Sequence, residues 1–158
     1  MNREQASLVQ QASAFTAVHL HNDEEGTEIL LRDLATEERG PDGFIYLAIL
    51  AAETWSHHTS VGGDDIWGRL APPDPGFPPA MVHRDVAISI AKALRDGDKT
   101  ALRSAKNQLD RGTAYLSAFD LALSAVNLLA AATRKSAEEW CRLWAGGAAA
   151  GIGVDSPD

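Results

Sequence analysis

Histidine and carboxylate side chains near the middle of the chain come closest, by type and spacing, to a chemical site. Glu53 and His57 are four residues apart in a stretch with helical periodicity, so both side chains should share one helix face. Together with His58 and His83, they could supply ligands to a divalent metal inside a helical bundle. One candidate function is therefore a metal-dependent helical-bundle enzyme, or a small-ligand binder, that uses Glu53, His57 and His58.

The position of these residues favours a simpler interpretation. They fall at the expected end of a helix, where histidines and carboxylates commonly lie in water as caps or weak ion pairs. A second pair, His19 and Asp23, straddles an expected helix break, and no Glu-x-x-His sequence completes a di-metal set. We therefore predict no bound metal and no cofactor.

Nucleophilic chemistry has equally little support. The single Cys141 excludes an internal disulfide and an all-cysteine metal site, and its segment contains no histidine that could activate it. A buried, small apolar residue is the expected role of Cys141. The serines lack a nucleophile-elbow sequence, and the glycines lack a phosphate-binding sequence. We predict no catalytic residue, and the sequence leans against an enzyme.

The most informative single residue is Asp120, which lies within the long apolar stretch 113–133. This stretch contains no proline and no glycine, and its polar residues are spaced four, three, four and three apart, as in one stripe of a helix. They are Thr113, Ser117, Asp120, Ser124 and Asn127. Because every position of the stripe is polar, we expect it to face solvent. If it is instead covered, Asp120 must pair with an arginine or a histidine, or be protonated.

A second helix that needs covering is expected over 44–55, which is apolar nearly all round. The apolar spacing predicts an all-α, single-domain bundle of six or seven helices around 44–55 and 113–133. The domain is expected to cover 1–145, with a flexible tail over 146–158.

Capping residues place the helix ends. Asn2 with Gln5 and Ser136 with Glu139 match the capping-box pattern, and Asp98 is an expected N-cap. A further helix is expected to begin at Asn22 or Asp23. We also expect Gly112 to end one helix and Thr113 to cap the next.

A Gly/Pro-rich loop over 59–80 interrupts the helical pattern. An irregular connection of this length is uncommon in compact domains and is usually functional or disordered. It carries two large aromatic residues, Trp67 and Phe77. We expect Trp67 to pack back onto the bundle or into a second subunit, and both residues are candidate anchors for a partner.

Negative charge is concentrated in the first half of the chain. Residues 1–79 contain thirteen carboxylates and four arginines, whereas residues 80–158 are nearly balanced. This imbalance argues against nucleic-acid binding through the first half, because phosphate binding needs clustered Lys and Arg. It favours a protein partner with a basic surface, and Asp23, Glu24 and Glu25 are the candidate contacts.

The stretch 113–133 is long enough to cross a membrane, but a charge at mid-bilayer costs about 2.5–3.5 kcal/mol. Since Asp120 and Asn127 lie mid-stretch, we expect no membrane span. The N-terminal residues lack the apolar core of a secretion signal, so we expect a cytoplasmic protein.

The function predicted from these features is a non-enzymatic interaction or regulatory protein, an adaptor or inhibitor. It would act through the acidic half and the aromatic-bearing loop. A structural or assembly protein of a larger particle fits the same features, and a homo-oligomer stays open.

Overall fold

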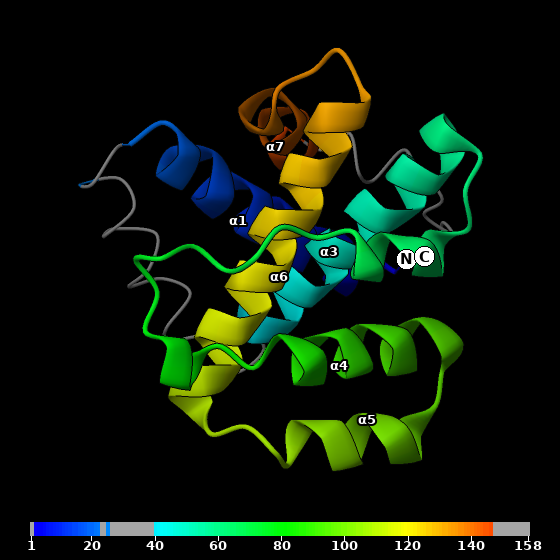
Figure 1. The fold of residues 1–158 in the computed structure, drawn as a ribbon, viewed down its shortest axis with the longest axis vertical. Helices are drawn as coiled ribbons and strands as arrows, with labels where there is room; N and C mark the ends of the chain where they lie inside the picture. Colours follow the sequence, from blue (N-terminus) through cyan, green and yellow to red (C-terminus); the bar gives the residue numbers. More distant parts are fainter. Residues whose placement is uncertain (1, 23–24, 26–39, 147–158) are drawn as a thin grey trace.

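The computed structural model describes residues 2–22, 25 and 40–146, and every regular element within them is a helix (Figure 1). They are α1 (Arg3–Leu20), α3 (Gly40–Thr59), the 3-10 helices η1 (Gly63–Gly68) and η2 (Pro79–Met81), α4 (Arg84–Asp96), α5 (Lys99–Lys106), α6 (Arg111–Ala132) and α7 (Ala137–Ala145). The predicted all-α class is confirmed. The helix expected to begin at Asn22 or Asp23 and the tail 147–158 lie outside the described residues.

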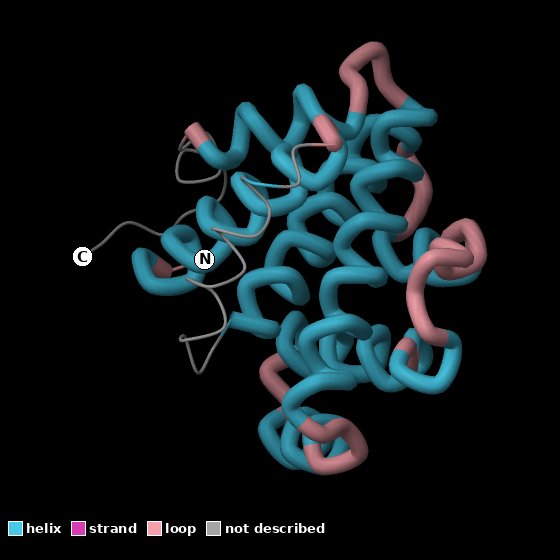
Figure 2. Tube along the Cα trace, turned by 90° about the vertical axis from the view of Figure 1, so that its left-hand side faces the viewer, coloured by secondary structure: helices cyan, strands magenta, loops and turns pink. Residues whose placement is uncertain are grey.

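Helices α3 and α6 pack on each other at the centre, as expected from their apolar sequences. Helix α1 packs on α3 and α7, and α7 also packs on α6. Helix α4 packs on both α3 and α6, whereas α5 packs mainly on α4 (Figure 1). Figure 2 shows the loops at the periphery of this arrangement. The two apolar helices are thereby covered by their neighbours, which an isolated helix of this composition would require in water.

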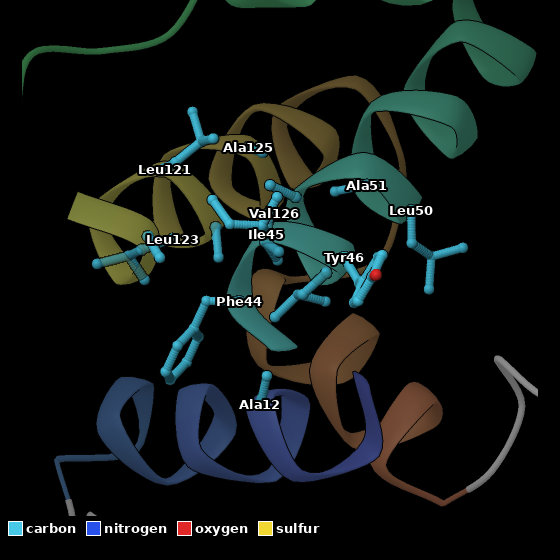
Figure 3. Packing of buried hydrophobic residues seen from close by; sticks show 14 of the residues in the cluster. Ala12, Phe44, Ile45, Tyr46, Leu50, Ala51, Leu121, Leu123, Ala125 and Val126 are labelled. Atoms are coloured by element: carbon cyan, nitrogen blue, oxygen red, sulfur yellow. The ribbon is translucent and has the colours of Figure 1, made fainter. Parts of the chain in front are cut away.

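An aromatic cluster joins α1, α3 and α6 in the core. The rings of Phe15 and Phe119 meet edge to face at 5.2 Å between centroids, and those of Phe15 and Phe44 at 5.5 Å. Figure 3 shows Phe44 projecting from α3 toward α1, while Val126 and Leu123 lie on α6. Edge-to-face pairs add about 0.5–1.5 kcal/mol beyond the burial of their area. The cluster therefore fixes how the first helix sits against the central pair.

Helix α1 begins at the predicted capping box, in which the Asn2 side chain and the Gln5 side chain each accept a backbone N–H of the other. Ser136 and Glu139 form the same arrangement at the start of α7, and Gly146 caps its end. The Asp98 side chain accepts the backbone N–H of Ala101 at the start of α5. These predictions are confirmed.

The boundary between α5 and α6 differs from the sequence expectation. Helix α5 ends at Lys106 with Asn107 as its C-cap, well before Gly112, and α6 is capped by Asp110 rather than by Thr113. Thr113 is the third residue of α6 and completes a capping box with Asp110. Gly112 thus lies inside the first turn of α6. The prediction was wrong because aspartate, a strong N-cap, comes three residues before the threonine and satisfies the free backbone N–H groups first.

The middle of the polar stripe of α6 is not open to solvent, so the expectation was wrong there, although Asn127 at the end of the stripe is exposed. Asp120 is 1% exposed and Ser117 is fully buried. The guanidinium of Arg84 donates to both carboxylate oxygens of Asp120, from Nε at 3.0 Å and from Nη2 at 2.9 Å. Its Nη2 also donates to Ser124 Oγ at 2.7 Å. The second alternative holds at Asp120: this part of the stripe is covered, and the carboxylate is paired with an arginine.

The same residues fasten the Gly/Pro-rich loop across α6, and Figure 1 shows the loop in green passing in front of that helix. Arg84 donates through Nη1 to the Ala71 carbonyl. The backbone N–H of His83 donates to Ser117 Oγ at 2.8 Å, and Ser117 Oγ donates to the Met81 carbonyl at 3.3 Å. We refer to the interactions of Arg84, Ser117, Asp120 and Ser124 as the Arg84–Asp120 clasp. It supplies buried partners for polar groups that lie in mid-helix.

Within the described residues, the stretch Thr113–Ala132 of α6 is the one helical segment with the length and apolar character of a membrane span. In the fold it is a core helix packed on α3, α4 and α7. The core helix of a water-soluble protein has the same length and composition, so this feature alone assigns no location.

Candidate functional site

A cleft of about 550 Å³ opens between the starts of α3 and α6 on one side and α4 and α5 on the other. Its lining is mostly apolar, with three charged residues and one proline. The lining residues are Pro41, Asp42, Ile45, Ala87, Ile90, Lys106, Leu109, Asp110, Ala114 and Ala118. Small-molecule and side-chain binding sites of proteins commonly have this volume and this mixture of apolar walls with a few polar groups. We call this region the α3–α6 cleft.

The close approach of α1 and α3 positions the first wall of the cleft. A Cβ atom on Gly43 would lie 2.8 Å from the carbonyl oxygen of Leu8, closer than real contacts allow. Glycine at this position therefore lets the first turn of α3 lie directly on α1, with Pro41 inside that turn, where a missing N–H has no helical partner to lose. Asp42 and Ile45 consequently face the α4–α5 side of the fold, where they line the cleft.

Small side chains leave the space open. Ala114 and Ala118 are four residues apart on α6, and Ala87 lies on α4. Ala87 and Ala118 are 0% and 2% exposed and belong to the core next to the cleft, whereas Ala114 is partly exposed. Because α5 packs mainly on α4, it forms an outer wall that is held on one side only.

The charged groups of the cleft are arranged unequally. Lys106 Nζ lies 2.9 Å from Asp42 Oδ1, and the Lys106 side chain is 42% exposed whereas that of Asp42 is 12% exposed. Asp110 holds the N-terminus of α6 through its bond with the Thr113 N–H. The cleft therefore carries two carboxylates fixed at helix starts and one ammonium on a long, flexible and largely solvated side chain.

Sequence reasoning missed this cleft. Along α6, Ala122 and Ala125 are packed in the core, Ala118 lies in the core and also lines the cleft, and Ala114 is partly exposed at the cleft wall. The only signal in the sequence was the charged series Lys106, Asp110 and Asp42, and its members come together only in the fold.

The candidate anchor Trp67 is 9% exposed and belongs to the hydrophobic core, because η1 packs against α3. The expectation that Trp67 packs back onto the bundle is confirmed. Phe77 is half-buried, with its ring 5.9 Å from that of Phe119. Both aromatic residues thus contribute to the fold, and their role as partner anchors stays a prediction.

The loop is tied to α4 by a charged contact next to Trp67. Arg95 Nη1 is bonded to Asp64 Oδ1, and this hydrogen bond is the main cause of the lowered pKa of Asp64. Arg69 lies over the ring of Trp55 at 5.4 Å from its centroid. These exposed contacts restrict the first half of the loop, but each is of the kind that is strongly screened by solvent.

The acidic candidates fall mostly outside the described residues. Asp23 and Glu24 are among the residues whose structure is not described, and Glu25 is exposed. Their role in binding a basic partner stays a prediction.

The histidine candidates do not converge in the described part of the chain. Glu53, His57, His58 and His83 are all exposed. The His57 and His58 rings are 6.1 Å apart at their centroids, and His58 lies against Trp140 at 5.9 Å. Among the described residues no three His, Cys, Asp or Glu side chains are grouped as metal ligands would be. The structure thus assembles no site around these four residues.

Two potentially reactive groups are buried rather than presented. Cys141 is 0% exposed, and burial raises the pKa of its thiol to about 12. Burial likewise raises the pKa of the Tyr115 hydroxyl. A thiol that stays protonated at neutral pH is a poor nucleophile and a poor metal ligand, which agrees with the structural role expected for Cys141.

The chain matches no protein-family model, no curated protein and no solved structure.

Proposed function

We propose that this chain is a non-enzymatic interaction protein, an adaptor or inhibitor, and that the α3–α6 cleft is where it holds its partner. The observation that carries the proposal is the cleft itself, a concave and mostly apolar space with charged groups at helix starts. Recognition sites on proteins commonly combine an apolar pocket for an anchor residue with a polar rim that excludes wrong partners.

The distribution of charge supports a basic partner. Residues 1–79 have a formal charge of −9, from thirteen carboxylates and four arginines, and α3 brings part of this acidic half to the cleft. Fields of one sign steer an oppositely charged partner and raise its association rate, most strongly at low ionic strength. The acidic residues Asp23, Glu24 and Glu25 would then act in encounter, while the cleft would hold the anchor.

Site-specific photo-cross-linking in the native host tests the proposal. A photoreactive amino acid at Leu109, which lines the cleft, should capture a distinct protein, whereas the same group at Leu143, exposed on α7, should not. Capture at Leu109 should weaken as salt is raised and in the variant with Asp23, Glu24 and Glu25 changed to Ser. Capture that is equal at both positions, or that is indifferent to salt and to this variant, would contradict the proposal.

A further inference from the structure

We propose that residues 71–75 are a ligand in polyproline II conformation, and that the partner they fit is a protein domain with a groove lined by tryptophan and tyrosine rings. These residues begin the segment 71–81, which crosses in front of α6 (Figure 1) and which we call the proline strap. The inference goes beyond the proposed function, because it concerns a surface other than the α3–α6 cleft. It rests on the spacing of the prolines, their exposure and the attachment of the strap at both ends.

Proline sterics keep the start of the strap extended. A residue that precedes a proline is pushed out of the helical region into the extended or polyproline region. This restriction applies to Ala71, Pro72 and Asp74, because a proline follows each of them. Residues 70–74 accordingly belong to no helix or turn. A polyproline helix has three residues per turn, so the rings of Pro72 and Pro75 lie along one edge of it.

The prolines of the strap are open to solvent. Every residue of 71–80 is exposed except Phe77, which is partly buried. No described residue donates a hydrogen bond to the carbonyls of Pro72, Pro73 or Pro75. Aromatic-lined grooves bind proline-rich segments of this conformation, whose backbone has no internal hydrogen bonds. Both the rings and the carbonyls that such a groove contacts are therefore available.

The chain turns directly after this ligand. The Phe77 N–H donates to the Asp74 carbonyl at 2.9 Å, and the Gly76 N–H donates to Asp74 Oδ1 at 2.8 Å. Asp74 is the one charged residue of 71–80, and its carboxylate holds this turn. The surface ahead of the turn thus consists mainly of proline rings and backbone carbonyls, which favours recognition by aromatic rings over recognition by ion pairs.

Attachment of the strap to the bundle prepares it for binding. The Ala71 carbonyl accepts a hydrogen bond from Arg84 Nη1, and the Met81 carbonyl accepts one from Ser117 Oγ at 3.3 Å. Between these ends, the Phe77 ring packs on an aromatic ring of α6 at 5.9 Å between centroids. A segment with fixed ends and many prolines has little conformational freedom to lose, and preorganisation of this kind raises affinity.

Isolated domains of known groove chemistry provide the test on the full chain. The probes are one SH3 domain and one WW domain, both of which bind proline-rich segments in aromatic-lined grooves. Each is isotopically labelled, so that the indole N–H resonance of its groove tryptophan reports binding. At least one of the two domains should bind the full chain with a shift of this resonance. Failure of both to bind, or binding without a shift at the groove, would overturn the proposal.

Matched double variants locate the contact on the strap. Pro72→Ala with Pro75→Ala should weaken binding at least about tenfold, because both rings on the groove-facing edge are lost. Pro78→Ala with Pro79→Ala changes the same number of exposed prolines after the turn, so its affinity should stay within about twofold of the parent. Equal weakening by the two variants, or none by the first, would overturn the proposal.

The outcome does not depend on how well any variant folds, because the parent chain must already bind one of the probes. The probes do not report on the α3–α6 cleft. A negative result therefore removes this inference alone, while photo-cross-linking at Leu109 remains the separate test of the proposed function.

Discussion

The Arg84–Asp120 clasp and the α3–α6 cleft both involve α4 and α6, but the ion pair of the cleft joins α3 to α5, and the two regions hold charge in opposite ways. In the clasp both oxygens of a carboxylate that is 1% exposed are bonded to one guanidinium, and the neighbouring serine hydroxyls are bonded as well. In the cleft the Asp42 carboxylate meets the ammonium of Lys106, whose side chain is 42% exposed, beside about 550 Å³ of open space. The clasp is closed by its own side chains, whereas the cleft leaves space beside its charged groups.

In a fold of this kind, binding sites are expected where charged groups are not fully committed to structure. A buried bidentate pair is strongly destabilised by removal of one partner, so its residues are committed to structure. The pair in the cleft is solvated on the Lys106 side only, so removing Lys106 should cost less than breaking the clasp. Helix α6 contributes Ser117, Asp120 and Ser124 to the clasp, and Ala114 and Ala118 to the lining of the cleft.

The largest effect should come from breaking the clasp. Asp120→Leu leaves Arg84 buried without its carboxylate and should lower the free energy of unfolding by about 3–5 kcal/mol. The double variant Arg84→Met with Asp120→Leu should recover much of this loss, because both charges are then gone. Urea denaturation of the two single variants and the double variant measures the effect. A loss below about 1 kcal/mol for Asp120→Leu would mean that the stripe is exposed in solution after all.

Alkaline pH should give the next effect, through Cys141. Burial raises the pKa of this thiol to about 12, so the unfolded chain loses the proton first as the pH rises. The stability contributed by the buried neutral thiol is complete below the pKa of the unfolded thiol and is lost as pH rises toward 12. Cys141→Ala should therefore show a shallower decline of stability above pH 9 than the parent.

Thiol labelling provides the companion measurement. Native protein at pH 8 should react with a disulfide reagent only at the rate at which it unfolds, and the protein in urea should react at once. Rapid labelling of the native protein would show that Cys141 is accessible and would remove the basis of the alkaline prediction.

Breaking the ion pair of the cleft should have a smaller effect on stability. Lys106→Met should lower the free energy of unfolding by about 1–2 kcal/mol, less than the clasp variants, because Lys106 is partly in water although Asp42 is buried. Urea denaturation under identical conditions makes the two pairs directly comparable. A loss as large as that of Asp120→Leu would place Lys106 with the structural residues and remove the distinction between the two regions.

The smallest effect is expected at the histidines. His57→Ala should change stability by less than about 0.5 kcal/mol, since His57 is exposed on the last turn of α3. Elemental analysis of the native protein should find no stoichiometric metal. One zinc, iron or manganese per chain that is lost in His57→Ala would restore the metal-dependent enzyme as the leading function.

The sequence predicted most of the local structure of the described residues. Capping boxes at Asn2 and Ser136, the apolar helices and the interruption by glycine and proline all depend on near neighbours in the chain, so short-range physics suffices to read them. The start of α6 was predicted wrongly because Asp110 and Thr113 are both good capping residues, and only one of them can be the N-cap of the helix.

Long-range pairing could not be read in the same way. The stripe containing Asp120 has the same spacing whether it meets water or Arg84, which is 36 residues away in sequence. The cleft is harder still, since Ala114 at the cleft wall and Ala122 in the packed core are the same residue type about two turns apart. Which alanine faces a neighbour and which faces a space is decided by the arrangement of helices, not by any single segment.

Substituting two alanines of α6 and measuring stability tests the cleft most directly. Ala114→Leu places its side chain at the wall of the α3–α6 cleft, so the free energy of unfolding should stay within about 0.5 kcal/mol of the parent. Ala122→Leu, about two turns further along α6 and fully packed, should lose about 1–3 kcal/mol through overpacking. That difference is the predicted result. Equal destabilisation by the two substitutions would contradict the cleft as a preformed open space.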